Sequence, residues 1–168
     1  MWLRFQEARS FEELAALSPS ERRQAIIRNA ALFVGDPYYW GGRSPAGGLT
    51  PKGSGPAVTG IDCSGLVNLA YRGAGVDIPR DAHEQFLRAK PVNALQPADL
   101  VFLSERSDPK RIVHVMLYAG EDEIIEGPGT GKTVHRIALA QRLGRPLDEL
   151  SPGAVLDEQT VFFGSYLP

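Results

Sequence analysis

The sequence is poor in cysteine and has no long hydrophobic run. Cys63 is the only cysteine among 168 residues, which excludes a disulfide within the chain and any zinc site built from several cysteines. The cysteine content therefore does not indicate a redox compartment. No apolar run approaches the roughly 18 residues of a membrane-spanning helix, and residues 1–7 are too polar and acidic for a signal peptide. We therefore expect no membrane span.

An excess of charge of either sign is also absent. The chain has 18 basic and 20 acidic residues, a formal net charge of −2, and its basic residues are scattered along the sequence. A nucleic-acid partner needs a concentrated basic surface, so we expect none. The length fits one domain with a sizeable core. Within it we expect a helical segment over residues 1–35 that leads into a domain over residues 36–168.

Two helices are predicted near the start of the chain. Residues 10–13 and residues 18–21 each form a capping box, a serine followed three residues later by glutamate, and Pro19 occupies the first position of the second helix. We expect the second helix to run through Phe33 and to end at Gly35, because glycine accepts the left-handed conformation common after a helix.

Glycine and proline are concentrated after these helices. Residues 35–62 hold eight glycines and four prolines, a composition that favours an irregular loop. Loops of this length in a compact domain are commonly functional, so we expect this one to wrap a site. Apolar residues at helical spacing then predict a helix over residues 63–75. A shorter helix is predicted over residues 81–89, with Asp81 as its cap.

The second half of the chain is rich in strand-forming residues. Runs of β-branched and apolar residues alternate with turn residues. They predict strands over residues 100–103, 112–119, 123–126, 133–137 and 160–166. Helices followed by a series of strands indicate the α+β class with an antiparallel sheet.

Cys63 stands where a glycine-rich turn passes into a predicted helix. The first N–H groups of a helix lack intrahelical acceptors and carry the positive end of the helix dipole. A thiol at this position is pushed towards thiolate and faces donors that can hold an oxyanion. The position predicts a nucleophile. The alternative is a buried, unreactive thiol, which is a common state of free cysteines.

A cysteine nucleophile needs a base within hydrogen-bonding reach. His114 lies inside one of the predicted strands and shares a face with Ile112 and Met116. It is either that base or a histidine of the hydrophobic core. His83 and His135 have no comparable setting, and we expect both on the solvated surface.

Glu126 is a candidate partner for the His114 imidazole. It ends the next predicted strand, twelve residues after His114. Because side chains alternate along a strand, Glu126 falls on the His114 face if the intervening loop holds an odd number of residues. Its carboxylate can then accept the ring N–H. The alternative is a carboxylate at the sheet edge in solvent.

Several motifs in one order resemble the NlpC-type cysteine peptidases of bacterial cell-wall metabolism. The resemblance covers roughly residues 25–140 and is specific because several motifs recur together. The motifs are Tyr38-Tyr39-Trp40-Gly41-Gly42, Asp62-Cys63-Ser64-Gly65-Leu66-Val67, Ile78-Pro79-Arg80, Gln85, Pro97-Ala98-Asp99-Leu100-Val101-Phe102 and His114-Val115-x-x-Tyr118. The resemblance implies a papain-like α+β core, with the nucleophile at the N-terminus of a central helix packed on an antiparallel sheet.

The resemblance also assigns roles to single residues. It makes Cys63 the nucleophile and His114 the base, and it places Tyr38 in the oxyanion site or against the substrate. The family's third catalytic position is commonly histidine and sometimes asparagine or glutamine, and here that position holds Glu126. A carboxylate stabilises imidazolium more strongly than a neutral partner does, so it favours a thiolate–imidazolium pair.

Substrate-binding residues are implied in the same way. Relatives that cut stem peptides recognise a free N-terminal L-alanine through an acidic residue and a serine beside the cysteine, here Asp62 and Ser64. We also expect substrate contacts from Trp40 and Arg80, which stand in matched motifs. The stretch from Tyr38 to Cys63, which contains the loop over residues 43–60, is longer than is usual in the family. Its insertion, residues 50–56, either alters substrate choice or is an ordinary surface loop.

The activity implied by the resemblance is hydrolysis of the bond between γ-D-glutamate and a diamino acid in peptidoglycan stem peptides. It requires no metal or organic cofactor, and its partner is a stem peptide or muropeptide. The alternatives are a related cysteine amidase or acyltransferase with another acyl donor, and a non-catalytic module that binds the wall or a partner. The sequence indicates neither the diamino acid nor the oligomeric state. It allows cytoplasmic muropeptide recycling as well as the cell envelope after signal removal.

One further motif, over residues 127–133, resembles a phosphate-binding loop. Glu126 stands where such a loop needs its first glycine, and a carboxylate there would repel a phosphate. Too few residues follow Thr133 to build the βαβ units of a nucleotide-binding fold. We therefore expect a turn at this position.

Overall fold

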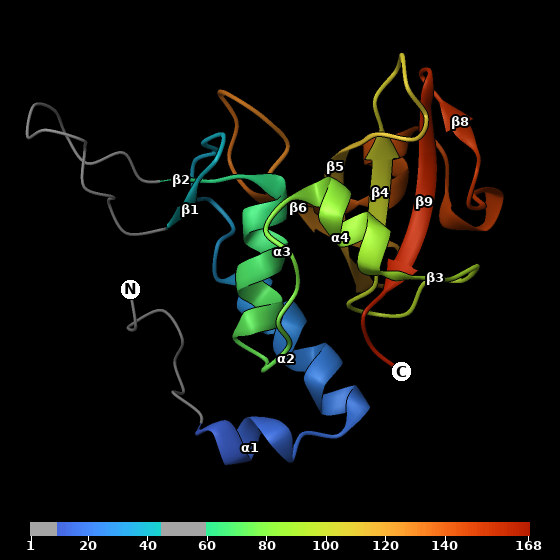
Figure 1. Cartoon of the computed structure of the whole chain (residues 1–168). Helices are drawn as coiled ribbons and strands as arrows, with labels where there is room; N and C mark the ends of the chain where they lie inside the picture. The colour runs from blue at the N-terminus through green and yellow to red at the C-terminus, as the bar shows by residue number, and fades with distance from the viewer. Residues whose placement is uncertain (1–9, 45–59) are drawn as a thin grey trace, which may run out of the picture.

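A set of helices and an antiparallel sheet make up the computed structural model, which describes residues 10–44 and 60–168 (Figure 1). The helices are α1 (Phe11–Ala15), α2 (Pro19–Ala31), α3 (Cys63–Arg72), α4 (Ala82–Arg88), α5 (Leu139–Leu143) and the 3₁₀ helix η2 (Leu147–Glu149). The strands are β1 (Arg43–Ser44), β2 (Gly60–Ile61), β3 (Lys90–Pro91), β4 (Leu100–Ser104), β5 (Ile112–Gly120), β6 (Glu123–Glu126), β7 (His135–Ala138), β8 (Val155–Leu156) and β9 (Gln159–Ser165). The insertion at residues 50–56 lies outside the described residues.

The main sheet has the strand order β3-β9-β4-β5-β6-β7, with β8 paired to β9. All of these pairs are antiparallel, which confirms the predicted α+β class. The tight turn between β5 and β6 is formed by Glu121 and Asp122, both in the left-handed region with φ of 52° and 58°. Turns of this hand suit the twist of a hairpin, so the sequence returns β6 directly alongside β5.

The predicted capping boxes are present at both N-terminal helices, with reciprocal bonds between each serine and the glutamate three residues later. The expected end of the second helix is wrong. α2 ends at Ala31, before Phe33. In a continued helix the backbone N–H of Gly35 would bond to the Ala31 carbonyl, but it bonds to the Val134 carbonyl at 2.9 Å instead. Gly35 is nevertheless left-handed, with φ of 94°. α2 packs against α3 in one core, and a boundary between residues 35 and 36 stays a prediction.

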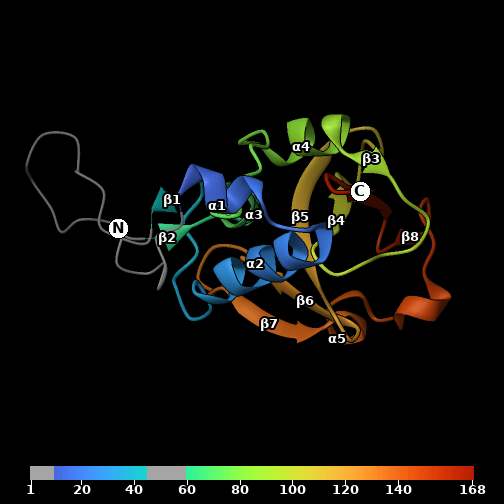
Figure 2. The same ribbon diagram turned by 90° about the horizontal axis from the view of Figure 1, so that it is seen from below.

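Apolar side chains fill two clusters, one on each face of the sheet. α2 and α3 cover the first face, where the apolar residues of α3 pack against strand residues such as Val115 and Leu117 (Figures 1 and 2). The second face buries Met116, Ile124 and Leu139 together. Because α3 is held against the sheet through buried apolar side chains, its N-terminus has a fixed place above the strands.

A β-bulge in β5 changes the predicted faces. His114 pairs with Leu103 while Ile112 pairs with Ser104, so Val113 is an extra residue and is 44% exposed. Ile112 consequently joins the α3-covered cluster, whereas Met116 joins the opposite one. The prediction that Ile112, His114 and Met116 share one face is therefore wrong. Bulges redirect neighbouring side chains, and this one directly precedes His114.

The remaining predictions concern the short elements. α4 forms as predicted with Asp81 at its N-cap position, but the Asp81 side chain makes no capping hydrogen bond. Residues 127–134 join two antiparallel strands, β6 and β7, so they are not the strand-to-helix loop that binds phosphate. Within residues 10–44 and 60–168, no helix has the length and apolar character needed to cross a bilayer.

Candidate active site

Cys63 is the first residue of α3, and Asp62 is the N-cap of that helix. The Asp62 Oδ1 atom accepts the backbone N–H of Gly65 at 2.7 Å, which fixes the first turn and leaves the N–H groups of Cys63 and Ser64 without intrahelical acceptors. A side chain at Gly65 would collide with Gly42, whose carbonyl oxygen would lie 2.5 Å from the added Cβ. Glycine at position 65 therefore lets the loop approach the start of the helix.

The Cys63 thiol lies within hydrogen-bonding reach of the His114 ring and of the Val115 backbone N–H. Burial raises the pKa of Cys63, but the hydrogen bond and positive charge of His114, together with the Val115 N–H, outweigh it. The pKa of Cys63 is therefore lowered from its ordinary value. The residue is only 7% exposed, so this is a buried thiol whose surroundings favour its ionised form.

Glu126 ends β6 and is fully buried. Its Oε2 atom lies 2.5 Å from the His114 Nε2 atom. With Nε2 held by the carboxylate, Nδ1 is the nitrogen of His114 that is available to Cys63. The alternative of a solvent-exposed Glu126 at the sheet edge is wrong. The structure thus brings Cys63, His114 and Glu126 into one hydrogen-bonded row, hereafter the triad, whose catalytic roles stay predictions.

The two partners of the triad have shifted pKa values of opposite sign. Burial lowers the pKa of His114, but its hydrogen bonds to Cys63 and Glu126 raise it to about 9. Burial raises the pKa of Glu126, whereas the hydrogen bond and charge of His114 and the charge of Arg142 lower it to about 2. Near neutral pH the row therefore holds an ionised carboxylate next to an imidazolium.

Two residues that the sequence reasoning missed also contact Glu126. The His135 Nε2 atom lies 3.0 Å from Oε1, and the Arg142 Nε atom donates to the same oxygen at 2.7 Å. The expectation that His135 is on the solvated surface is wrong, because β7 pairs with β6 so that His135 lies directly opposite Glu126. The expectation for His83 is also wrong: its Nδ1 atom accepts the backbone N–H of Ile112 at 3.2 Å.

The predicted substrate-binding residues Asp62, Ser64 and Arg80 bind one another. Arg80 donates from Nη2 to the Asp62 Oδ2 atom at 2.7 Å and from Nη1 to the Ser64 hydroxyl at 2.9 Å. Asp62 also accepts the backbone N–H of Gly41 at 2.9 Å. Asp62 and Ser64 are buried, and the Arg80 guanidinium compensates the charge of the Asp62 carboxylate.

Tyr38 and Trp40 differ in how close they come to the triad. Burial raises the pKa of Tyr38 to about 12, and the nearby Cys63 charge adds to this effect. The Tyr38 hydroxyl therefore keeps its proton and can donate a hydrogen bond near the nucleophile. Trp40 is 82% exposed, and no hydrogen bond joins it to the triad within the part of the chain that the structure describes. Substrate contact by Trp40 stays a prediction.

A model of the NlpC/P60 family matches residues 35–145. The chain is also 32% identical over 120 residues to the γ-D-glutamyl-L-lysine dipeptidyl-peptidase of Bacillus subtilis (strain 168). That match covers 70% of this chain and 36% of the relative, so the chain spans little more than a third of that protein's length.

Solved structures share the fold. The peptidoglycan hydrolase RipB from Mycobacterium tuberculosis matches with a TM-score of 0.67 and 27% identity, over 92% of this chain and 71% of that one. RipD from the same organism, described as a non-catalytic domain protein adapted to peptidoglycan binding, matches with a TM-score of 0.62 and 23% identity, over 87% and 98% of the two chains. The predicted papain-like α+β fold is thereby confirmed, and with the family match over residues 35–145 the chain belongs to the NlpC/P60 family.

Proposed function

We propose that this protein is a cysteine peptidase that hydrolyses the bond between γ-D-glutamate and a diamino acid in peptidoglycan stem peptides. One observation carries the proposal. Cys63 lies at the start of a helix within reach of His114, whose other ring nitrogen is held by the buried carboxylate of Glu126. The named activity of the Bacillus subtilis relative supports the choice of bond.

The first half-reaction transfers the γ-glutamyl group to Cys63. The thiolate attacks the γ-glutamyl carbonyl carbon, and the backbone N–H groups at the start of α3 hold the oxyanion, with the protonated Tyr38 hydroxyl as a further donor. The His114 imidazolium gives its proton to the nitrogen of the diamino acid. The C–N bond then breaks and a thioester remains on Cys63.

The second half-reaction releases the acyl group. Neutral His114 takes a proton from water, and the resulting hydroxide attacks the thioester carbonyl. The C–S bond breaks, the thiolate re-forms and the imidazolium is restored beside it. Glu126 stays ionised throughout, because its pKa of about 2 is far below neutral pH, and it keeps the ring oriented towards Cys63.

Recognition of a free N-terminal L-alanine is a separate part of the proposal. It assigns the amine to Asp62 and Ser64, although both Asp62 oxygens already have partners, among them Gly65 and Arg80. The amine would therefore share the carboxylate with these donors. Cleavage of L-Ala-γ-D-Glu-L-Lys can be compared with that of the same peptide acetylated on its amine. Equal rates would remove this part of the proposal and leave the peptidase activity in place.

The proposal is tested by incubating the purified protein with L-Ala-γ-D-Glu-diamino acid tripeptides and identifying the products by mass spectrometry. We expect the dipeptide L-Ala-D-Glu and the free diamino acid, and no cleavage by Cys63→Ala. Full activity of Cys63→Ala would contradict the mechanism. Transfer of the acyl group to an added amine in preference to water would identify an acyltransferase. Binding of the peptide without cleavage would identify a non-catalytic module.

A further inference from the structure

The two carboxylate oxygens of Glu126 have different partners. The Oε2 atom faces the His114 ring, whereas the Oε1 atom lies 2.7 Å from the Arg142 Nε atom and 3.0 Å from the His135 Nε2 atom. The carboxylate is fully buried, while the side chains of Arg142 and His135 are 30% and 33% exposed. A buried charge is costly unless it is paired and hydrogen-bonded. Arg142 and His135 therefore satisfy the oxygen that His114 leaves open.

Arg142 is the one of these two donors that does not depend on protonation. A neutral imidazole carries its N–H on one nitrogen only, so His135 donates from Nε2 in one tautomer and not in the other. A guanidinium stays protonated and charged. In either state of His135, Arg142 therefore keeps a charge-assisted hydrogen bond on the Oε1 atom of Glu126.

The fold fixes the position of Arg142. Its helix, α5, begins at Leu139, whose side chain is fully buried in the apolar cluster on the second face of the sheet. The backbone N–H of Leu139 bonds to the Asp122 carbonyl at 2.7 Å. Residues three apart on a helix lie on the same face, so Arg142 projects from the side of α5 that Leu139 anchors. Because Asp122 belongs to the turn between β5 and β6, Arg142 is tied to the hairpin that carries His114 and Glu126.

We propose that Arg142 is a positioning residue of the triad, which holds the Oε1 atom of Glu126 so that the Oε2 atom stays directed at His114. The inference rests on the proposed peptidase function, in which a protonated His114 releases the leaving amine. The terminal torsion of a glutamate side chain is broad, so a carboxylate held at one oxygen only is freer to turn away from the ring. Electrostatics agree with this role. Burial raises the pKa of Glu126, the hydrogen bond and charge of His114 lower it, and the charge of Arg142 lowers it further, to about 2 in all.

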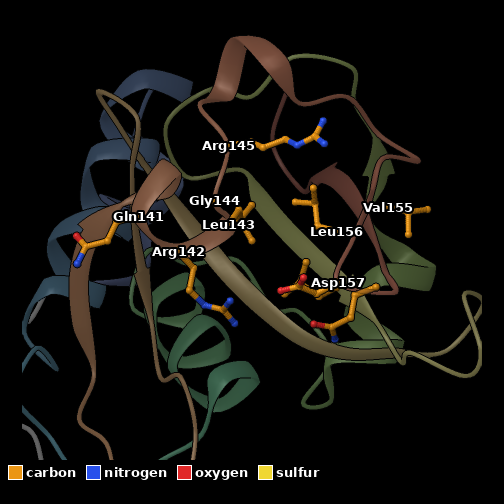
Figure 3. Close-up of a pocket in the computed structure, with 10 residues that line it drawn as sticks. Gln141, Arg142, Leu143, Gly144, Arg145, Val155, Leu156 and Asp157 are labelled. Atoms are coloured by element: carbon orange, nitrogen blue, oxygen red, sulfur yellow. The ribbon is translucent and has the colours of Figure 1, made fainter.

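Other charged groups near this contact come from different elements. Lys132, in the loop between β6 and β7, lines a cavity together with Glu126 and Arg142. Figure 3 shows the Arg142 side chain extending from α5 into a second cavity, of about 520 Å³, which Arg145 and Asp157 also line. These groups are present in the unaltered protein and in every variant compared below. A difference between those proteins therefore reports on the contact of Arg142 with Glu126.

The test replaces Arg142 by glutamine and follows cleavage of the tripeptide from about pH 5 to pH 10. We expect kcat/KM at pH 8 to fall by about three- to tenfold, the effect of one hydrogen bond, mainly through kcat. The alkaline limb should move to lower pH, because a loosened carboxylate stabilises the imidazolium less. Arg136→Gln is the matched control. The Arg136 Nε atom also donates to a glutamate of β6, Glu123, at 2.6 Å, but this pair is exposed, so its profile should equal that of the unaltered protein.

A double variant separates positioning from other roles. If Arg142 acts only through Glu126, adding Arg142→Gln to Glu126→Gln changes neither kcat/KM nor the alkaline limb further. Thermal denaturation shows whether each variant is folded. If Arg142→Gln alone does not fold, the double variant still gives the comparison, because the carboxylate that Arg142 holds is then absent. A further loss in the double variant, an effect confined to KM, or a limb that moves to higher pH overturns the inference.

Alkylation of Cys63 by iodoacetamide gives a readout that needs no turnover. In Arg142→Gln the less stable imidazolium should raise the pKa of Cys63, so the alkylation rate reaches its half-maximum at higher pH than in the unaltered protein. This shift is expected even if the tripeptide is not cleaved, which distinguishes failure of the peptidase proposal from failure of this inference. An alkylation profile equal to that of the unaltered protein contradicts the positioning role of Arg142.

Discussion

Replacing Glu126 by glutamine removes one buried negative charge from the triad and keeps the size of the side chain. Glu126 faces the His114 ring at 2.5 Å and is fully buried, so solvent does not screen this interaction. Without the carboxylate charge, Cys63 still raises the pKa of His114, while burial of the ring lowers it. We therefore expect the pKa of His114 to fall from about 9 towards its ordinary value of about 6.5.

The expected loss of activity follows from the protonation of His114. The imidazolium must donate a proton to the leaving amine, so activity is lost as the pH rises through the pKa of His114. At pH 8 about 90% of the ring is protonated if that pKa is about 9, and about 3% if it is about 6.5. We expect kcat/KM of Glu126→Gln to fall at pH 8, by at most about 30-fold, which corresponds to about 2 kcal/mol. The alkaline limb should move to lower pH by at most about 2.5 units.

The assay is the pH dependence of tripeptide cleavage from about pH 5 to pH 10. Glu123→Gln is the matched control, because Glu123 lies on the same strand and pairs with Arg136 at the surface, at 2.6 Å. Its profile should equal that of the unaltered protein. Thermal denaturation shows whether each variant is folded. If folded Glu126→Gln keeps the alkaline limb of the unaltered protein, Glu126 does not stabilise the imidazolium and the reasoning is refuted.

Two further substitutions test how the fold supports the site. Gly65→Ala should lower the melting temperature and kcat/KM, because the added Cβ would lie 2.5 Å from the Gly42 carbonyl oxygen. Alanine ordinarily stabilises a helix interior by about 1 kcal/mol, so a raised melting temperature in calorimetry would contradict this prediction. Asp99→Asn removes the partner of the buried Arg23 guanidinium, 2.8 Å away, at the end of β4 remote from His114. Urea denaturation should show a loss of about 3 kcal/mol in the free energy of unfolding. The kcat/KM of the folded variant should be unchanged. A loss of kcat/KM would link the Arg23–Asp99 pair to catalysis and contradict this prediction.

Features that depend on near neighbours in the chain could be predicted from the sequence. The capping boxes and the helix that begins at Cys63 follow from residues three or four positions apart. The two-residue turn at Glu121 and Asp122 returns β6 beside β5. The odd-numbered loop on which the prediction for Glu126 depended is not present, and alternation across this even turn would put Glu126 on the face opposite His114. The register shift between Tyr118 and Gly120, which the sequence does not indicate, brings Glu126 back to the His114 face. The order of the motifs supplied the pairing of Cys63 with His114, which spacing alone does not contain.

Features that depend on strand pairing across the sheet could not be predicted. The bulge at Val113 exists only because β5 pairs with β4 in a shifted register, and that register is not a property of either strand alone. His135 meets Glu126 only because the intervening loop sets the pairing of β6 with β7. Arg142 lies on α5, a five-residue helix with no long apolar periodicity to mark it. The ring of donors around Glu126 was therefore missed.

The most direct test of the central claim is the rate at which iodoacetamide alkylates Cys63 as a function of pH. Because Cys63 is the only cysteine, the added mass reports on this thiol alone. Pairing with the His114 imidazolium lowers the pKa of Cys63, so the account predicts fast alkylation well below the ordinary thiol pKa of about 8.5. A rate that rises only around that ordinary pKa, or a thiol that reacts only after unfolding, would contradict the account.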